Sequence, residues 1–339
     1  MSNIPKTYRA AFVEEKGGKF VVKEVEYKSP SEGQVTVKVL ASGVCHSDSI
    51  VVEQHMPIPL PRCPGHECVG EVVEVAPGEK RWKVGDRVGA GWHGGHCFSC
   101  SSCLRGDFVT CEKENINGIL TDGGHAEYAT FRSESLASLP TDIDPAEAAP
   151  LLCAGVTTFN SLRNMDLHPG DVVAVQGIGG LGHLALQFSR QMGFKTIALS
   201  GSDSKKQLAQ ELGAHVYVDS SKEDPVEVLQ KEGGAKVIVC TAPNPEIVQT
   251  LVNGLGVNGQ LLILAVGGNI EVPMIALIQK RLSIRGWPSG NPIDEEDTVR
   301  FAQAAGVHCK VQKFKLDDIQ QAYDAMMDGS ARFRSVITF

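Results

Sequence analysis

Four cysteines lie close together in one short stretch of the chain. They are Cys97, Cys100, Cys103 and Cys111, so two CxxC spacings are followed by a gap of seven residues. Four thiolates complete the tetrahedral coordination of zinc and leave no position for a substrate. The repeated spacing therefore predicts a structural zinc site that stabilises this loop but does no chemistry itself.

A glycine-rich turn in the second half of the chain carries a different chemistry. The apolar segment Asp171–Gln176 runs directly into the GxGxxG sequence Gly177, Ile178, Gly179, Gly180, Leu181, Gly182. The first glycine of such a motif allows a tight turn, the second lets the backbone approach a pyrophosphate, and the third lets the next helix pack on the strand. The N-terminus of that helix faces the anion. This context predicts a dinucleotide-binding site.

The following strand indicates which dinucleotide is preferred. An acidic residue usually ends this strand when the cofactor is NAD, but Thr196–Leu199 is followed by Ser200. Ser200, Ser202 and Lys205 could together receive a 2′-phosphate, which predicts NADP(H) in preference to NAD(H). Asp203 lies in the same loop and could turn toward the ribose, so NAD(H) stays open. The segment also fits an ordinary helix N-cap.

Three further runs identify a family. The sequences GVCHSD at 43–48, GHE at 65–67 and CAGVT at 153–157 surround the four-cysteine loop in this order. They resemble the zinc-dependent alcohol dehydrogenases of the medium-chain dehydrogenase/reductase family, and the resemblance covers essentially the whole chain. It implies a catalytic zinc bound by Cys45, His66 and Cys153, with a fourth position open. This ligand set comes from the family, because the spacing could not have assembled it.

The resemblance also assigns roles to neighbouring residues. Glu67 matches a carboxylate that can approach the metal, and Asp48 matches the carboxylate that orients the ligand histidine. Ser47 matches the hydroxyl that passes the alcohol proton toward the nicotinamide ribose. Many relatives place a histidine three residues later, where this chain has Ile50, so the relay must end at the ribose hydroxyl and water. His55 is an alternative base.

Other roles implied by the family concern the cofactor and the substrate. The further cofactor-binding residues are His46, Thr157, Val266 and Arg334. The segments that line the substrate pocket contain His55, Met56, Trp92, Ile119 and Trp287. These side chains suggest an apolar cavity for a medium-sized or aromatic group, although core packing is an alternative for Met56 and Ile119.

The implied reaction is hydride transfer between NADP(H) and a primary alcohol or aldehyde, with zinc acting as a Lewis acid. The pattern of Ser200, Ser202 and Lys205 is similar to that of cinnamyl-alcohol-type enzymes within the compact microbial and fungal forms. One alternative is a zinc-fold reductase of another acceptor, such as an iminium or an activated alkene. A more distant one is a non-catalytic protein that binds zinc and a dinucleotide.

Two kinds of sequence pattern must position these residues. From Tyr8 to about Gly91, apolar residues alternate as in short strands, and a long helix is expected over Asp144–Met165, starting at Pro145. After Pro169, strands and helices alternate, which is typical of a parallel doubly wound sheet. We therefore expect an α/β protein with two domains. Residues 1–155 and 290–339 would form a β-rich GroES-like catalytic domain with both zinc sites, and residues 156–289 a Rossmann domain.

Length and composition agree with this organisation. The chain has 339 residues, a formal net charge of −8 and no run of basic residues, so a small molecule is a better partner than nucleic acid or an anionic membrane. The sequence contains neither a signal peptide nor an apolar stretch of membrane-spanning length, which predicts a cytoplasmic protein. The family implies a homodimer or homotetramer in which the expected edge strand 282–286 pairs across a two-fold axis.

Overall fold

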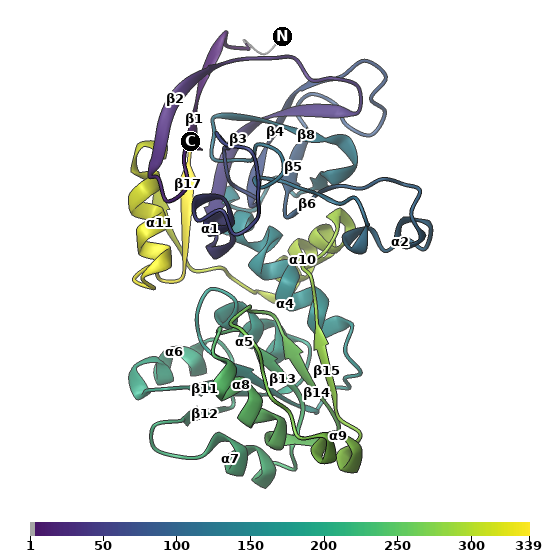
Figure 1. Ribbon diagram of the computed structural model, residues 1–339, viewed down its shortest axis with the longest axis vertical. Coiled ribbons are helices and arrows are strands. Elements are labelled where there is room, and N and C mark those ends of the chain that lie inside the picture. The colour runs from purple at the N-terminus through teal and green to yellow at the C-terminus, as the bar shows by residue number, and fades with distance from the viewer. Residues whose placement is uncertain (1–3) are drawn as a thin grey trace. The chain divides into compact units, whose positions relative to one another are not determined.

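The structure is a computed structural model that describes residues 4–339 (Figure 1). It divides into two compact units. The first contains the described residues up to Val156 together with Gly290–Gln303 and His308–Phe339. The second contains Thr157–Ser289 and Ala304–Val307.

The first unit is built on a seven-stranded sheet in the order β16-β17-β3-β4-β5-β9, with β8 also paired to β3. The strands are β3 (Gln34–Val44), β4 (Cys68–Val75), β5 (Arg87–Ala90), β8 (Tyr128–Arg132), β9 (Ala137–Ser138), β16 (Val311–Phe314) and β17 (Arg334–Thr338). All pairs are antiparallel except β16 with β17. Val35, Val37 and Val39 are buried, so the alternating pattern correctly indicated a β-rich unit.

Two smaller strand pairs complete this unit. The hairpin of β1 (Thr7–Val13) and β2 (Phe20–Glu26) is antiparallel, as is the pair of β6 (His93–Gly95) and β7 (Asn115–Ile116). A core cluster that includes Val44, Val51, Ile119 and Ile337 joins β3 and β17 to the short helix α1 (Ser49–Val52). The strand that carries Cys45 at its end is therefore firmly packed.

The prediction of one long helix over Asp144–Met165 is wrong. The structure has α3 (Pro145–Ala148), η4 (Ala149–Leu152) and α4 (Ala154–Arg163), with Cys153 outside the helical region at φ −130° and ψ −76°. Pro150 explains the break, because proline donates no backbone hydrogen bond and clashes with the preceding turn. The predicted start is confirmed: Asp144 accepts a hydrogen bond from the Ala146 N–H, and Pro145 follows it.

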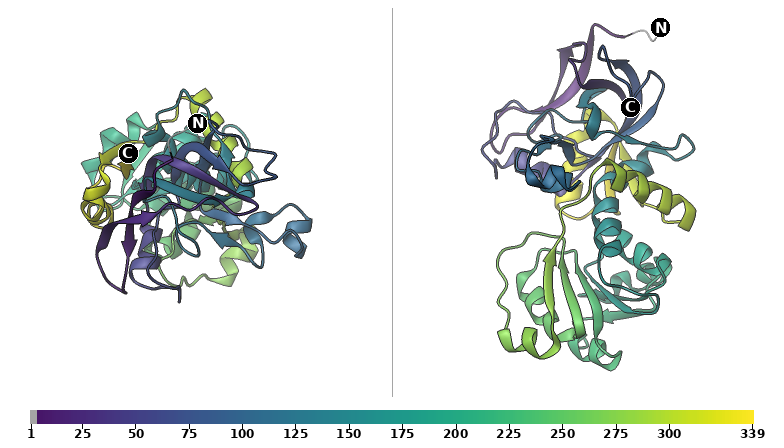
Figure 2. Two further views of the ribbon diagram at one scale, coloured as in Figure 1. Left: turned by 90° about the horizontal axis from the view of Figure 1, so that it is seen from above. Right: turned by 90° about the vertical axis from the view of Figure 1, so that its right-hand side faces the viewer.

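The second unit contains a six-stranded parallel sheet in the order β12-β11-β10-β13-β14-β15. The strands are β10 (Val172–Gln176), β11 (Lys195–Ser200), β12 (Val216–Asp219), β13 (Ala235–Cys240), β14 (Leu255–Ile263) and β15 (Ser283–Gly286). Helices lie on both faces of this sheet (Figure 2). This is the strand order of the Rossmann fold, so the predicted fold class is confirmed.

The helices of this unit follow the expected alternation. They are α5 (Gly182–Gln191), α6 (Lys206–Glu211), α7 (Pro225–Lys231), α8 (Pro245–Leu251) and α9 (Met274–Lys280). The sequence predicts a strand over residues 261–266. The observed strand, β14, begins earlier, at Leu255, and also ends earlier, at Ile263, before Gly267 and Gly268.

The C-terminal part of the chain returns to the first sheet. It contains α10 (Pro292–Ala305), β16, α11 (Ile319–Met327) and β17, so it holds the two expected helices and the expected last strand. β16 was not anticipated. Among residues 4–339, no helix combines the length and the apolar character needed to cross a membrane.

Candidate active site and metal centres

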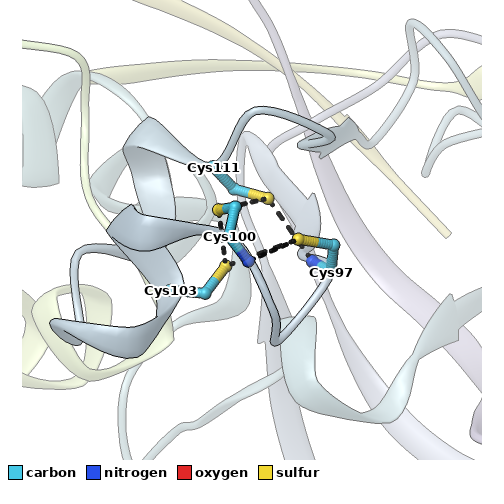
Figure 3. A group of neighbouring side chains, drawn as sticks. All are labelled: Cys97, Cys100, Cys103 and Cys111. Atoms are coloured by element: carbon cyan, nitrogen blue, oxygen red, sulfur yellow. Dashed lines mark hydrogen bonds between the residues drawn. The ribbon is translucent and has the colours of Figure 1, made fainter.

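The four cysteines predicted as a structural site come together (Figure 3). The Sγ–Sγ distances are 3.5 Å for Cys100 and Cys103, and 3.9 Å for both Cys97–Cys103 and Cys100–Cys111. Zn–S bonds of about 2.3 Å put the sulfurs of a tetrahedral site about 3.8 Å apart. These thiols therefore have the spacing that tetrahedral zinc requires.

Backbone amides of the loop prepare these sulfurs for a cation. The N–H groups of Cys100 and Lys113 donate to the sulfurs of Cys97 and Cys111 at 3.4 and 3.3 Å. Backbone and hydroxyl donors from Ser99 lower the pKa of Cys97 to about 5, with the N–H of Cys100 adding to the effect. Hydrogen bonds that favour the thiolate favour metal binding in the same way.

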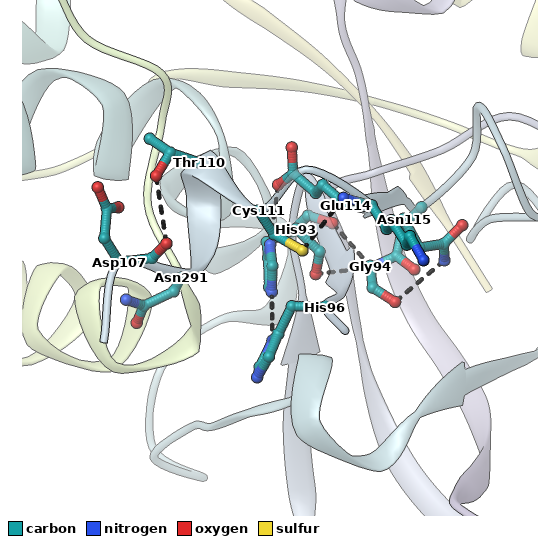
Figure 4. Close-up of polar contacts among 12 residues, drawn as sticks. His93, Gly94, His96, Asp107, Thr110, Cys111, Glu114, Asn115 and Asn291 are labelled. Atoms are coloured by element: carbon teal, nitrogen blue, oxygen red, sulfur yellow. Dashed lines mark hydrogen bonds and ion pairs between the residues drawn. The ribbon is translucent and has the colours of Figure 1, made fainter. Parts of the chain in front are cut away.

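A buried polar chain fixes the start of this loop. His93 on β6 contacts Glu114 Oε1 through Nδ1 at 2.8 Å and His96 Nδ1 through Nε2 at 3.0 Å (Figure 4). The His96 ring is stacked on Phe108, with centroids 4.0 Å apart. Because His96 directly precedes Cys97, these contacts hold one end of the cysteine loop on β6 and β7.

The second donor set is assembled from three distant parts of the first unit. Its members are Cys45, His66, Glu67 and Cys153, and one ligand atom from each lies within 4.8 Å of all the others. Cys45 follows β3, His66 and Glu67 precede β4, and Cys153 lies at the break before α4. The helix break therefore brings the Cys153 sulfur to 3.8 Å from that of Cys45.

The chemistry of this set fits zinc. Cys45 and Cys153 supply two sulfurs at tetrahedral spacing, and His66 is fully buried with Nε2 making no hydrogen bond to any described residue. A buried imidazole nitrogen without a partner is costly unless it ligates a cation. The hydrogen bond with Cys153 lowers the pKa of Cys45 against the effect of burial, and the neighbouring His66 adds to the lowering.

Glu67 stands apart from the other three donors. Its carboxylate forms a buried ion pair with Arg334 on β17, while Oε2 has no hydrogen-bond partner among the described residues. Burial raises the pKa of Glu67, and Arg334 opposes the rise. A Cβ on Gly43 would lie 1.9 Å from Glu67 Oε2, so only glycine fits there. The main candidate metal ligands are therefore the two thiolates and the imidazole, and the Glu67 carboxylate lies beside them.

Asp48 lies behind the histidine. Its Oδ1 is 3.4 Å from His66 Nδ1, and its Oδ2 accepts from the Cys45 backbone N–H at 2.9 Å. A second histidine, His125, contacts the same Oδ2 through Nε2 at 3.3 Å. Sequence reasoning missed His125, because a single histidine 59 positions away from His66 carries no spacing signal.

The remaining site residues that we expected in the first unit differ in their burial and in their contacts. Ser47 and His46 are in the 3-10 turn after Cys45, Ser47 half-buried and His46 exposed. Trp92 meets the His66 ring edge-on, with centroids 5.1 Å apart. His55 and Met56 are exposed in the loop after α1. Ile119 is fully buried in the core, which agrees with the alternative of core packing.

The glycine turn of the second unit has the geometry of a phosphate cradle. Gly177 has φ +87°, and a Cβ on Gly182 would lie 2.0 Å from the Gly177 carbonyl, so both positions require glycine. A Cβ on Gly179 would meet nothing within 4 Å, which leaves open space over the turn. The turn runs from β10 into α5 beside β13, where the strand order reverses. Ligands bind at this switch point in doubly wound sheets.

The residues expected to select the cofactor lie at the end of β11. Ser200 ends the strand, Ser202 is exposed, and Lys205 Nζ donates to the Ile178 carbonyl of the glycine turn at 2.8 Å. The carboxylate of Asp203 is paired with Lys222. Thr157 is buried on α4, Trp287 is partly exposed after β15, and Val266 is 98% exposed in the segment after β14.

Two family models match the chain. Residues 31–141 match the alcohol dehydrogenase GroES-like domain, and residues 180–304 match the zinc-binding dehydrogenase domain. An alcohol dehydrogenase from Penicillium expansum, patD, is 48% identical over 337 residues and covers 99% of each chain.

Solved structures agree with these matches. The alcohol dehydrogenase of Aeropyrum pernix is 31% identical, with a TM-score of 0.87 and coverage of 98% and 100% of the two chains. A cinnamyl alcohol dehydrogenase of Sorghum bicolor is 27% identical, with a TM-score of 0.86 and coverage of 98% of each chain. The chain therefore belongs to the zinc-dependent alcohol dehydrogenases of the medium-chain dehydrogenase/reductase family, enzymes that interconvert alcohols and carbonyl compounds.

Proposed function

We propose that this enzyme holds two zinc ions and reduces an aldehyde, or oxidises the corresponding primary alcohol, with NADP(H). The observation that carries the proposal is the open donor set: two sulfurs 3.8 Å apart and a buried imidazole whose Nε2 has no hydrogen-bond partner in the described chain. In this arrangement Cys45, His66 and Cys153 ligate the ion. The first unit is the catalytic domain, and the second, which contains residues 157–289 of the expected span 156–289, binds the dinucleotide.

Zinc held by these residues supplies a Lewis acid that polarises the substrate oxygen. Side chains of this protein orient the ligands around the ion. Asp48 Oδ1 lies 3.4 Å from His66 Nδ1, and a proton held there would leave Nε2 as the ligand atom. Trp92 packs edge-on against the His66 ring and helps to hold it in place. Arg334 forms an ion pair with Glu67 within the buried site and opposes the rise in the pKa of Glu67 that burial causes.

Ser47 is the group that carries the substrate proton. Its hydroxyl lies two residues after Cys45 in the 3-10 turn and is half-buried. Ile50 cannot continue a proton relay, and its side chain packs against the core. We therefore propose a relay from Ser47 to the cofactor ribose and water, with the exposed His55 as the alternative. A Ser47→Ala variant should lose turnover by about 10²-fold or more, in the range of lost proton-transfer groups.

The NADP(H) preference rests on the loop after β11. Ser200, Ser202 and Lys205 offer donors to a phosphate, while the one acidic residue of this loop, Asp203, is already paired with Lys222. Ser200→Asp should shift the kcat/KM ratio toward NAD(H), because a carboxylate repels the 2′-phosphate and binds the ribose hydroxyls. Ser31→Asp, at an exposed position of the first unit, is the matched control. An unchanged ratio in Ser200→Asp would mean that the ribose lies elsewhere.

We also propose that the enzyme is a homodimer or homotetramer. Strand β15 is the edge of its sheet and carries the exposed Ile284, and α9 exposes Met274, Ile275 and Ile278. An open edge beside exposed apolar side chains is unfavourable in a monomer. Ile284→Lys should shift the sedimentation coefficient toward that of the monomer. A wild-type monomer at micromolar concentration would contradict the proposal.

The decisive test combines metal analysis with a substrate screen. Purified enzyme should contain two zinc ions per chain and should oxidise NADPH with aliphatic, aromatic or unsaturated aldehydes. A single ion per chain would contradict the open site. Inactivity with every aldehyde, together with reduction of an iminium or an activated alkene, would favour the alternative acceptor instead.

A further inference from the structure

A buried chain of polar contacts, an ion-pair contact followed by hydrogen bonds, extends from the open donor set into the core of the first unit. It runs from His66 Nδ1 to Asp48 at 3.4 Å, from Asp48 to His125 Nε2 at 3.3 Å, and from His125 Nδ1 to Ser42 Oγ at 2.9 Å. All four side chains are fully buried. A chain of this kind is costly unless every member is satisfied, so each contact constrains the next.

The His125 backbone belongs to the same support. Gly123 and Gly124 donate to the carbonyls of Cys63 and Gly65 at 2.8 Å each, and His125 donates to that of Pro64 at 3.0 Å. The segment that carries His125 thus pairs with the segment that leads into His66.

Gly65 and Phe20 pack closely around the His125 ring. A Cβ on Gly65 would lie 2.8 Å from His125 Nδ1, and the Phe20 ring makes an edge-on contact with the histidine, with centroids 6.2 Å apart. Gly65 directly precedes His66, and its φ of +108° also requires glycine. The position of the imidazole is therefore fixed by packing as well as by hydrogen bonds.

The partners of Asp48 indicate which proton lies where. Oδ2 already accepts the Cys45 backbone N–H at 2.9 Å, and the carboxylate needs further donors because it is fully buried. A proton on His125 Nε2 supplies one such donor, and Nδ1 can then accept from the Ser42 hydroxyl. Asp48 is thereby free to orient His66 with its other oxygen.

We propose that His125 is a positioning residue for the catalytic metal. It holds Asp48 in the one orientation that serves both Cys45 and His66, and so it pre-arranges two of the ligands. This inference rests on the proposed function, because it assumes a metal at Cys45, His66 and Cys153. His125 touches neither the substrate nor the ligand atoms, so its effect must pass through Asp48.

The test compares two polar variants of similar size in the full-length zinc enzyme. In His125→Gln the terminal amide can reach Asp48, as Nε2 does, whereas in His125→Asn the shorter amide reaches toward Ser42 only. Affinity for the open-site ion is measured by competition with a chelator, and the geometry by the d–d spectrum of the Co²⁺-substituted enzyme. Contacts behind a metal ligand change affinity by about 10–100-fold, and His125 lies one contact further away.

We expect His125→Asn to weaken the open-site metal by about tenfold and to shift the Co²⁺ spectrum, and His125→Gln to stay within about threefold of wild type. The four-cysteine site should keep its ion in both. His168→Phe, on the exposed surface of the second unit, is the control.

Two results would overturn the inference. One is equal retention of the open-site ion in both variants and in wild type. The other is equal weakening of both metal sites in both variants, which would indicate general destabilisation. A wild-type enzyme that binds no metal at the open set would instead overturn the proposed function, and the inference with it.

Discussion

The two cysteine-containing donor sets of the first unit are built in opposite ways. The set from Cys97 to Cys111 is contained in fifteen consecutive residues, and its own backbone amides bind its sulfurs. The set of Cys45, His66 and Cys153 spans more than a hundred residues and depends on three separate elements. One site is local in the sequence, and the other exists only in the folded unit.

This difference is the basis of the different roles that we propose for the two sites. Four sulfurs leave a closed site that can only hold a loop together. In the dispersed set, two sulfurs and one imidazole leave room for a further ligand, and the surrounding charges of Asp48, Glu67 and Arg334 are buried. A site with an open position needs such external support, because its own ligands do not fix its geometry completely.

The largest effect should come from breaking the open set. A Lewis-acidic metal contributes several kcal/mol to the transition state, and about 1.4 kcal/mol corresponds to a factor of ten. Cys45→Ser should therefore lower kcat/KM by about 10³-fold or more and remove one of two zinc ions. Cys240→Ala, at a buried thiol of the second unit, is the matched control. Wild-type turnover in Cys45→Ser would refute the role of this set.

The next effect concerns the buried charge pair beside the open set. Arg334→Met leaves the Glu67 carboxylate buried without its cation, which should cost about 3–5 kcal/mol in the free energy of unfolding. The double variant Glu67→Gln with Arg334→Met should recover most of this loss. Urea denaturation of wild type, Arg334→Met, Glu67→Gln and the double variant gives the comparison. A single variant as stable as the double would show that the pair is not coupled.

The closed site should respond in stability rather than in chemistry. Cys103→Ser weakens a metal site whose binding is coupled to folding of the loop, and we expect the Tm to fall by about 5–10 °C. Activity at 25 °C should change far less than in Cys45→Ser. Calorimetry and initial rates measure the two effects, and Ser102→Ala in the same turn serves as the control. Loss of turnover at an unchanged Tm would reverse the assignment of the sites.

The smallest effect should come from a buried acid that supports the wall of the open set. Glu295 on α10 is fully buried beside Gly91, which precedes Trp92, and burial, with Asp294 and Glu296 nearby, raises its pKa well above the usual range. The neutral acid is therefore stabilising below the unfolded-state pKa of about 4.3, and this contribution is lost as the pH rises toward the folded-state pKa.

Glu295→Gln, uncharged at all pH values, should accordingly unfold at similar denaturant concentration to wild type at pH 4. Above that pH it should become progressively more stable than wild type, by about 1–3 kcal/mol, the cost of an unsatisfied buried polar group. Denaturation curves from pH 4 to pH 8 test this. A constant difference over that range would mean that Glu295 ionises normally.

The local features of this protein were predictable from the sequence. The four-cysteine loop, the glycine turn between β10 and α5, and the helix start at Asp144 and Pro145 each depend on residues a few positions apart. Their geometry follows from short-range rules of coordination, backbone conformation and capping. The alternation of strands and helices in the Rossmann fold was predictable for the same reason, because the local hydrophobic periodicity indicates each strand and helix.

The errors and omissions have two physical causes, one local and one tertiary. The interrupted helix at Cys153 depends on Pro150 within an otherwise helical pattern, and the apolar periodicity concealed it. β16 is half exposed and is a strand because it pairs with β17. His125 and Glu295 acquire meaning only through the groups that surround them after folding.

The sequence by itself therefore determined the fold class, the four-cysteine cluster and the glycine turn after β10, because their parts are neighbours in the chain. Only the tertiary structure decided how Cys45, His66 and Cys153 meet, and which buried groups orient them. Residues far apart in sequence have no local rule that fixes their distance. Packing of β3, β4 and the segment before α4 fixes it instead.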